Sequence, residues 1–165
     1  DVATIELAVR AALTGHLVLS TLHTNDTTSS YSRLLDMGID PFLITSTVRA
    51  IIAQRLIRRV CPNCKVSRKV NEYEIDKLGF KSDETVFEAH PEGCQNCGGK
   101  GYKGRTGIYE LLKPTLKLND MVNNRLSDHE IRTQAIHDGM DTLDSESRRL
   151  VIEGKTTIEE ITRVL

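Results

Sequence analysis

The chain has 165 residues, of which 39% are hydrophobic and 27% are charged, and its formal net charge at pH 7 is −1. This length is enough for one full hydrophobic core, or for one core with a small appendage. A net charge so close to zero gives no field that favours nucleic acid, and an aromatic content of 4% without tryptophan argues against a base-stacking surface. No apolar run approaches the roughly 20 residues of a membrane span. We therefore expect no nucleic-acid partner and no transmembrane segment.

The first residues predict a helix, a turn and a strand. Apolar side chains recur with helical spacing over 3–13, and Thr14-Gly15 ends the helix. The run Leu17-Val18-Leu19 is typical of a buried parallel strand, which we place at 17–22. Helical periodicity from the first residues, without an initial methionine, indicates a piece of a longer α/β protein.

Polar side chains crowd the end of this predicted strand, between Ser20 and Asp26. Open α/β sheets bind ligands beyond the carboxyl ends of their strands, so His23 and Thr24 could contact a water, a phosphate oxygen or a carbonyl there. The alternative is a strand that ends in a polar turn, with Asn25 or Asp26 capping the next helix. Composition alone favours this second interpretation.

Two helices and a basic strand follow. The patterns predict helices at 27–37 and 41–53 and a strand at 55–60. The arginines of this strand are Arg55, Arg58 and Arg59. They form either a solvated face or a set from which one guanidinium reaches a phosphate.

All four cysteines lie in two CxxC pairs separated by 29 residues. Four thiolates in this pattern are the ligand set of a structural, tetrahedral Zn²⁺ site, which leaves no open position for catalysis. Two disulfides are disfavoured in a chain without a secretion signal, and a redox CxxC does not explain two pairs. The predicted zinc ligands are Cys61, Cys64, Cys94 and Cys97. The segment 61–101 that they bracket is charged, has one weak helix at 71–78, and is too small to bury much apolar surface.

The remaining chain has ordinary globular patterning. We expect a strand at 106–112 and then helices at 118–125, 128–138, 142–153 and 157–165. Ser127 and Thr157 are predicted caps, with Glu130 and Glu160 three residues on, as in a capping box.

One motif is misleading. Glu153-Gly154-Lys155-Thr156 matches the end of a phosphate-binding loop, but Arg149 occupies the place of the first glycine. The preceding residues are patterned as a helix, whereas a phosphate loop follows a strand. The chain therefore has no Walker A motif.

The segment GHLVLSTLHTND, residues 15–26, resembles the histidine box of the secretion ATPases, which drive type II secretion and type IV pilus assembly. Further segments resemble that family in the family's order, so the resemblance covers almost the whole chain. They are DMGIDPFLI, AQRLIRRVCPNC, CGGKGYKGRTGIYELL, and GMDTL followed by EGKTTIEEI. The paired CxxC motifs are similar to those of the pilus-assembly and type II secretion branch, because the pilus-retraction branch lacks the cysteines.

This resemblance implies an α/β fold that is the C-terminal portion of a RecA-like P-loop ATPase domain, with an inserted tetracysteine zinc subdomain and a C-terminal helical bundle. The implied division is 1–60 for the ATPase core, 61–101 for the zinc insert, and 102–165 for a closing strand and helical region. The Walker A loop, the aspartate box and the Walker B motif precede the histidine box in the family and are not in this sequence. Asp1 aligns with the aspartate that closes the Walker B region. We therefore expect this chain alone to be inactive.

The resemblance also implies roles for single residues. His23 would be the catalytic residue, close to the γ-phosphate and coupling its presence to domain movement. The positions implied to bind or surround the nucleotide are His16, Thr21, Thr24, Asn25 and Arg55. Ala3 departs from the family, which usually has Glu at that position.

The whole protein would then be a homohexameric ATPase that uses ATP and Mg²⁺ and contains structural Zn²⁺. It would be cytoplasmic, peripheral at the inner face of the bacterial cytoplasmic membrane, and would act on an inner-membrane platform protein. The rival hypothesis is a zinc-stabilised interaction module with no nucleotide role, which docks through the helices from 118 onward. ATP binding by the protein with its upstream residues separates the two.

Overall fold

The computed structural model describes residues 2–165, so Asp1 and its predicted alignment with the Walker B region lie outside the described part. The chain forms two compact units. The first contains the described residues up to Ala53 together with Glu110–Thr142, and the second contains Gln54–Tyr109 and Leu143–Leu165. The mixture of helices and strands confirms the α/β prediction. The units do not follow the predicted segments 1–60, 61–101 and 102–165, because the last helices pack with the cysteine-bearing segment.

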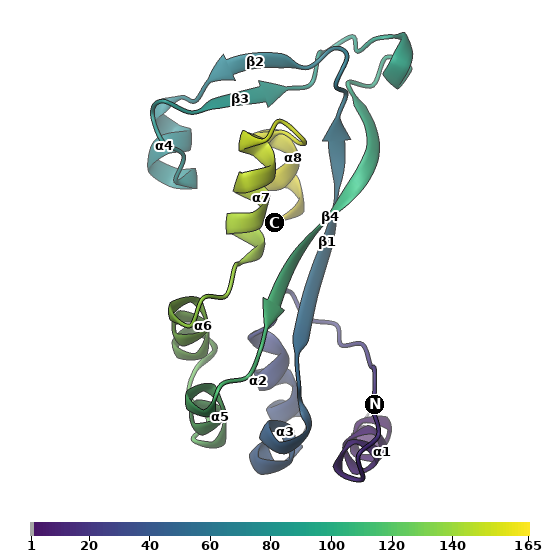
Figure 1. The fold of residues 1–165 in the computed structure, drawn as a ribbon, viewed down its shortest axis with the longest axis vertical. Coiled ribbons are helices and arrows are strands. Elements are labelled where there is room, and N and C mark those ends of the chain that lie inside the picture. The colour runs from purple at the N-terminus through teal and green to yellow at the C-terminus, as the bar shows by residue number, and fades with distance from the viewer. Residues whose placement is uncertain (1) are drawn as a thin grey trace. The chain divides into compact units, whose positions relative to one another are not determined.

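The first unit is built mainly from helices (Figure 1). They are α1 (Val2–Leu13), α2 (Ser29–Asp36), α3 (Pro41–Thr47), α5 (Leu116–Asn123) and α6 (Asp128–His137). Tyr31, Ile44, Leu118 and Ile131, one from each of α2, α3, α5 and α6, are among the fully buried side chains of its core. The helix α1 has no buried residue and contributes only partly buried side chains to this core.

Local capping signals place several of these helices. The Asp40 side chain accepts the N–H of Phe42 at 2.8 Å, and Pro41 occupies the first turn of α3, which begins at the predicted residue. The predicted capping box of Ser127 and Glu130 is present at the start of α6. The helix α5 begins earlier than predicted because the Thr115 hydroxyl caps it, accepting the N–H of Leu118 at 3.2 Å.

The second unit combines strands and helices. A long ribbon is formed by β1 (Ile51–Val60) and β4 (Tyr102–Leu112), whose first and last residues respectively belong to the first unit. A short antiparallel ladder pairs β2 (Val66–Lys69) with β3 (Thr85–Glu88), with Val66 opposite Glu88. The other elements are α4 (Glu72–Leu78), the 3₁₀ helix η1 (Gln95–Cys97), α7 (Leu143–Ile152) and α8 (Ile158–Val164).

The cysteine-bearing segment shares its core with the C-terminal helices. Phe80 and Val86 of this segment are buried against Val151, Ile158 and Ile161 of α7 and α8. In addition, the Lys65 ammonium donates to the carbonyl of Gly154 at 2.9 Å and lies 4.0 Å from the centroid of the Phe87 ring. The expectation that this segment buries little apolar surface is therefore wrong, because the partners come from the end of the chain.

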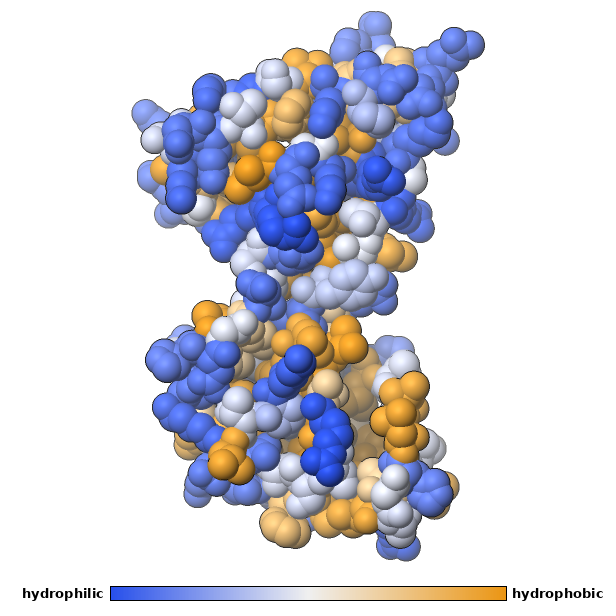
Figure 2. Space-filling view, in the orientation of Figure 1, coloured by the Kyte–Doolittle hydropathy of each residue, from blue (hydrophilic) through white to orange (hydrophobic). Residues whose placement is uncertain are grey.

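The predicted strand at 17–22 is wrong. These residues have no regular structure, and the side chains of Leu17 and Leu19 are 85% and 88% exposed. A strand requires a neighbour that pairs with it, and neither two-stranded sheet of the described residues includes this segment. On the face shown in Figure 2, apolar side chains lie uncovered over the part that corresponds to the first unit.

The predicted helix at 41–53 is also too long. The helix α3 ends at Thr47, and Ile51 already belongs to β1. The intervening residues are Val48, Arg49 and Ala50, of which Val48 already has an extended backbone with φ of −69° and ψ of 122°. The isoleucines that follow lie in the strand that pairs with β4, and β-branched side chains suit a strand.

Candidate functional site

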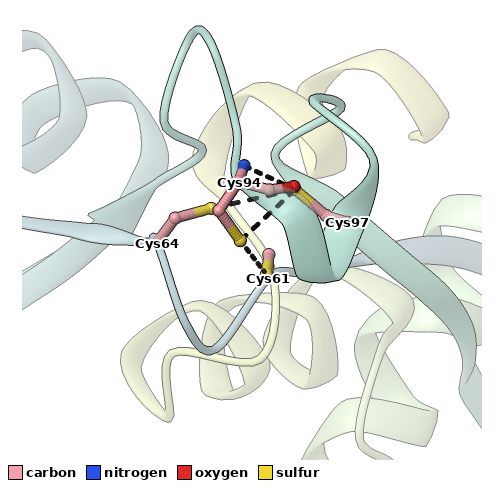
Figure 3. Close-up of side chains that lie close together, drawn as sticks. All are labelled: Cys61, Cys64, Cys94 and Cys97. Carbon is pink, nitrogen blue, oxygen red and sulfur yellow. Dashed lines mark hydrogen bonds between the residues drawn. The ribbon is translucent and has the colours of Figure 1, made fainter.

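The four cysteines come together at one end of the β1–β4 ribbon (Figure 3). Cys61 directly follows β1, Cys94 directly precedes η1, and Cys97 is the last residue of η1. All four thiols are free, and their sulfur atoms lie within 4.8 Å of one another. The individual Sγ–Sγ distances are 3.8 Å for Cys61 and Cys94, 3.9 Å for Cys64 and Cys97, and 3.9 Å for Cys94 and Cys97.

These distances fit a tetrahedral metal site. Four sulfurs at about 2.3 Å from a central Zn²⁺ would be separated by about 3.8 Å, whereas a disulfide would require about 2.05 Å. Two backbone N–H groups also donate to Cys97 Sγ, that of Cys94 at 3.1 Å and that of Gly101 at 3.3 Å. These bonds stabilise a thiolate, and the N–H of Cys94 makes the largest contribution to lowering the pKa of Cys97 to about 6. The donor set is therefore compatible with Zn²⁺.

Glycine permits the tight packing of this loop. Gly98 ends η1 with a φ of 61°, in the left-handed region. A Cβ on Gly93 would lie 2.4 Å from the carbonyl carbon of Gly99, so two backbone segments meet there without room for a side chain. Glycine at these positions therefore lets the backbone close around the cysteines.

The stretch Ser20–Asp26, here called the polar stretch, lies mostly at the surface. Thr21, His23 and Asn25 are exposed, whereas Thr24 is half-buried and its hydroxyl lies 2.9 Å from the hydroxyl of Ser30. His16, just before the stretch, is exposed and its Nδ1 lies 3.0 Å from the hydroxyl of Thr14. Both contacts lead to residues outside the predicted nucleotide site, so the roles of these side chains stay predictions.

The arginines of β1 have different surroundings. Arg55 is half-buried and donates from Nη1 to the carbonyl of Gln54 at 3.3 Å, within the second unit. Arg58 instead donates to the Glu160 carboxylate, and its guanidinium carbon lies 4.0 Å from the centroid of the Tyr102 ring. Arg58 therefore forms an ion pair with a buried carboxylate, which is neither of the two predicted alternatives.

Glu160 is a buried anion that sequence reasoning treated only as part of a helix cap. Its backbone N–H does donate to the Thr157 hydroxyl at 3.1 Å, as predicted. Its carboxylate, however, does not reach back to the start of the helix. It accepts from Arg58 Nη2 at 2.6 Å and from Arg163 Nη2 at 2.7 Å. The cap is thus confirmed and the reciprocal half of the capping box is wrong, because two guanidinium groups compete for the carboxylate.

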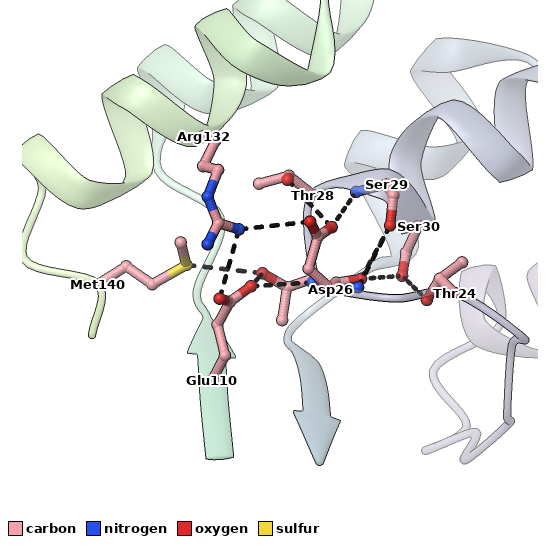
Figure 4. A network of polar contacts seen from close by, with 9 residues as sticks. Thr24, Asp26, Thr28, Ser29, Ser30, Glu110, Arg132 and Met140 are labelled. Atoms are coloured by element: carbon pink, nitrogen blue, oxygen red, sulfur yellow. Dashed lines mark hydrogen bonds and ion pairs between the residues drawn. The ribbon is translucent and has the colours of Figure 1, made fainter. Parts of the chain in front are cut away.

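A second buried carboxylate was not predicted at all. Glu110 of β4 is fully buried, and its Oε1 accepts the backbone N–H of Thr27 at 2.9 Å and also the Thr27 hydroxyl. Arg132 Nη1 of α6 lies 3.4 Å from Glu110 Oε2 and 3.4 Å from Asp26 Oδ2 (Figure 4). The only sequence signal was the alternation in β4, which puts Glu110 on the same face of the strand as Ile108 and Leu112.

Asp26 links this network to the start of α2. Its Oδ1 accepts the N–H of Ser29 at 2.8 Å and the hydroxyl of Thr28 at 3.3 Å. Partial burial opposes ionisation, but the bonds from Ser29 and the charge of Arg132 together lower the pKa of Asp26 below its usual range. The prediction that Asn25 or Asp26 is the cap of the following helix is wrong in position, because α2 begins at Ser29 and its N-cap is Thr28; Asp26 nevertheless accepts the N–H of Ser29, the first residue of α2.

No helix of residues 2–165 is both long enough and apolar enough to cross a membrane.

Comparisons with known proteins place these features in a family. The profile of the family described as "Type II/IV secretion system protein" matches residues 1–163. The type IV pilus assembly ATPase PilB of Myxococcus xanthus is 45% identical over 98% of the chain, and the type II secretion system protein E of Pseudomonas aeruginosa is 44% identical over 99%. The type IV pilus assembly ATPase TfpB of Acinetobacter baylyi is 41% identical over 100% of the chain. The chain spans only 29%, 32% and 28% of the lengths of these three relatives. This coverage and identity show that the chain belongs to the type II/IV secretion system protein family.

Proposed function

We propose that this chain is the C-terminal part of the motor domain of an ATPase that powers type IV pilus assembly or type II protein secretion. The match of the family profile over nearly the whole chain carries this proposal. The motor would have a RecA-like core and bind ATP with Mg²⁺ through segments that precede this chain. It would work as a homohexamer at the cytoplasmic face of the inner membrane and act on a membrane platform protein.

In this motor, His23 would sense the γ-phosphate, with His16, Thr21, Thr24, Asn25 and Arg55 as further nucleotide-site residues. An exposed imidazole on a stretch without regular structure supports this role, because it can contact a ligand without first breaking a buried contact. A hydrogen bond that exists before hydrolysis and is lost afterwards would bias the motor between two states.

The four cysteines would hold a structural Zn²⁺. When bound, the metal would supply no chemistry to ATP hydrolysis, since all four coordination positions are taken by thiolates. The chain's own contribution is to present the sulfurs at tetrahedral spacing, with the N–H groups of Cys94 and Gly101 stabilising Cys97. Measurement of bound zinc in the purified chain, with Cys97→Ser as the comparison, tests this assignment.

The sensor role is tested in the complete polypeptide that contains this chain. His23→Ala should reduce kcat for ATP hydrolysis by about tenfold or more with a much smaller change in ATP affinity. The matched control is His129→Ala, which removes an exposed imidazole from α6 of the same unit. Equal losses of kcat and affinity would contradict the sensor role, and absence of ATP binding by the complete protein would favour the interaction-module hypothesis.

A further inference from the structure

The two anionic side chains near the polar stretch share one arginine. Glu110 is held by the backbone and hydroxyl of Thr27, and Arg132 lies between the Glu110 and Asp26 carboxylates. We call the set Asp26, Thr27, Glu110 and Arg132 the carboxylate clamp. Its members come from the end of the polar stretch, from β4 and from α6, so it ties three separate segments of the first unit together.

A buried carboxylate is a costly way to fill a core position. Glu110 is 0% exposed, and an apolar side chain of similar volume at such a position is often as stabilising as a buried ion pair. Unlike an apolar side chain, the carboxylate accepts hydrogen bonds in defined directions. It fixes the amide and the hydroxyl of Thr27, and the shared Arg132 fixes Asp26, so two consecutive residues are held at the point where the polar stretch ends.

The rest of the polar stretch is held less firmly. The Thr24 hydroxyl is bonded to that of Ser30, but residues 17–24 have no regular structure and His23 is exposed. Leu22, directly before His23, is partly buried against the core of the first unit, so restraint on where His23 lies comes from this contact and from the two ends of the stretch. The carboxylate clamp is the buried restraint at the carboxyl end, within four residues of His23.

We propose that Glu110 and Arg132 are positioning residues that hold the polar stretch in the arrangement in which His23 meets the nucleotide. Neither residue needs to touch the nucleotide. This role rests on the function proposed above, because only then does the position of His23 matter for turnover. It assigns to β4 and α6 the task of supporting a site that lies on another segment of the chain.

The first test uses the chain itself and needs no nucleotide. Amide hydrogen exchange resolved over residues 24–28 should be at least about tenfold faster in Glu110→Gln than in the wild type, because the charged acceptor of the Thr27 N–H is lost. The matched control is Glu74→Gln, which neutralises a buried carboxylate paired with Arg68 in the second unit and should leave these amides unchanged. Unchanged exchange in Glu110→Gln would overturn the proposal.

Two further variants, Arg132→Lys and a double variant of Glu110 and Arg132, distinguish positioning from general destabilisation. Arg132→Lys keeps the charge and should raise the exchange rate less than Arg132→Gln does. The double variant Glu110→Gln/Arg132→Gln should be no faster than the faster single variant, because the two residues act as one clamp. If the increase in exchange rate of the double variant equals the product of the increases in the two single variants, the two residues act independently and the shared clamp is overturned. If Glu110→Gln fails to fold, the milder Thr27→Val, which keeps the amide donor, takes its place.

The second test uses the complete polypeptide. Arg132→Lys and Glu110→Gln should lower kcat for ATP hydrolysis with little change in KM, in the same direction as His23→Ala. If His23→Ala slows turnover while Glu110→Gln does not, the positioning role is overturned and the proposed function stands. If His23→Ala leaves turnover unchanged, the proposed sensor function fails, and the catalytic part of the positioning role fails with it.

Discussion

Glu160 offers the sharpest energetic prediction for the second unit. Its carboxylate is fully buried, yet it accepts from Arg58 and Arg163 and from the backbone N–H of Arg58 at 2.8 Å. Burial alone would raise its pKa, but the hydrogen bonds from Arg163 and then from Arg58 lower the pKa of Glu160 from an ordinary 4.5 to about 2. The folded state therefore stabilises the ionised form of this carboxylate more than the unfolded state does.

The shift converts into a contribution to stability with a definite sign. A pKa lowered from 4.5 to about 2 corresponds to about 3 kcal/mol at about 1.4 kcal/mol per pKa unit. Because the Arg58 and Arg163 side chains are 38% and 57% exposed, solvent screening reduces this to about 2 kcal/mol. Since the folded pKa is the lower one, the contribution is fully present above pH 4.5 and is lost as the pH falls towards 2.

The assay compares the unfolding free energies of the wild type and Glu160→Gln by urea denaturation at about pH 7 and at about pH 3.5. The variant should be less stable at neutral pH by about 2 kcal/mol, and the difference should shrink by about 1 kcal/mol at the acidic pH. Loss of thiolates and bound metal affects both proteins and cancels in the difference. Glu159→Gln, at an exposed neighbouring position, is the control and should change little at either pH. A difference between wild type and Glu160→Gln that does not depend on pH would refute the reasoning.

Two further predictions concern the packing of the second unit. Zinc chelation, or Cys97→Ser, should raise the rate of amide hydrogen exchange in α7 and α8 as well as in 61–101, because Phe80 and Val86 share a core with these helices. Unchanged exchange rates in α7 and α8 would contradict this prediction. Gly154→Ala should lower the free energy of unfolding by about 2–4 kcal/mol in urea denaturation, because φ is +66° and the new Cβ would lie 2.7 Å from the Phe87 ring and the Lys65 ammonium. The control is Gly139→Ala, where φ is +97° but no atom would lie within 4 Å of the new Cβ, so only the backbone cost of about 1–2 kcal/mol applies. If both variants lose the same free energy of unfolding, the clash at Gly154 is excluded.

Features that depend on a few neighbouring residues were predictable from the sequence. The Ser127–Glu130 capping box and the Asp40-Pro41 helix start need only side chains within one turn. The cysteine cluster was predictable for a related reason, because each CxxC pair is a local turn and the thiol chemistry brings the two pairs together. In these cases the interacting residues are close together in the sequence, so a local sequence pattern contains them.

Features that depend on distant partners were not predictable. The segment at 17–22 has the composition of a buried strand, but it has no strand beside it among the described residues. Glu160 has the spacing of a capping box, yet its carboxylate bonds to Arg58, 102 positions away. Glu110 bonds to Thr27, 83 positions away, and only its inward position on β4 hinted at burial. In such cases residue propensity and local spacing do not identify the distant residue that forms the hydrogen bond.

A metal held by the four cysteines would do more than hold 61–101 together. Cys61 follows β1 and its N–H donates to the carbonyl of Gly101 at 2.8 Å, directly before β4 begins. The N–H of Gly101 in turn donates to Cys97 Sγ. A metal on these sulfurs would therefore fix where the two strands meet and so maintain their register at this end. Because Arg58, which binds Glu160, lies only three residues before Cys61, a shift in register would also displace the contact between β1 and α8. The part of the ribbon that belongs to the second unit, the cysteine cluster and α8 are thus linked through Cys61, Gly101 and the Arg58–Glu160 pair.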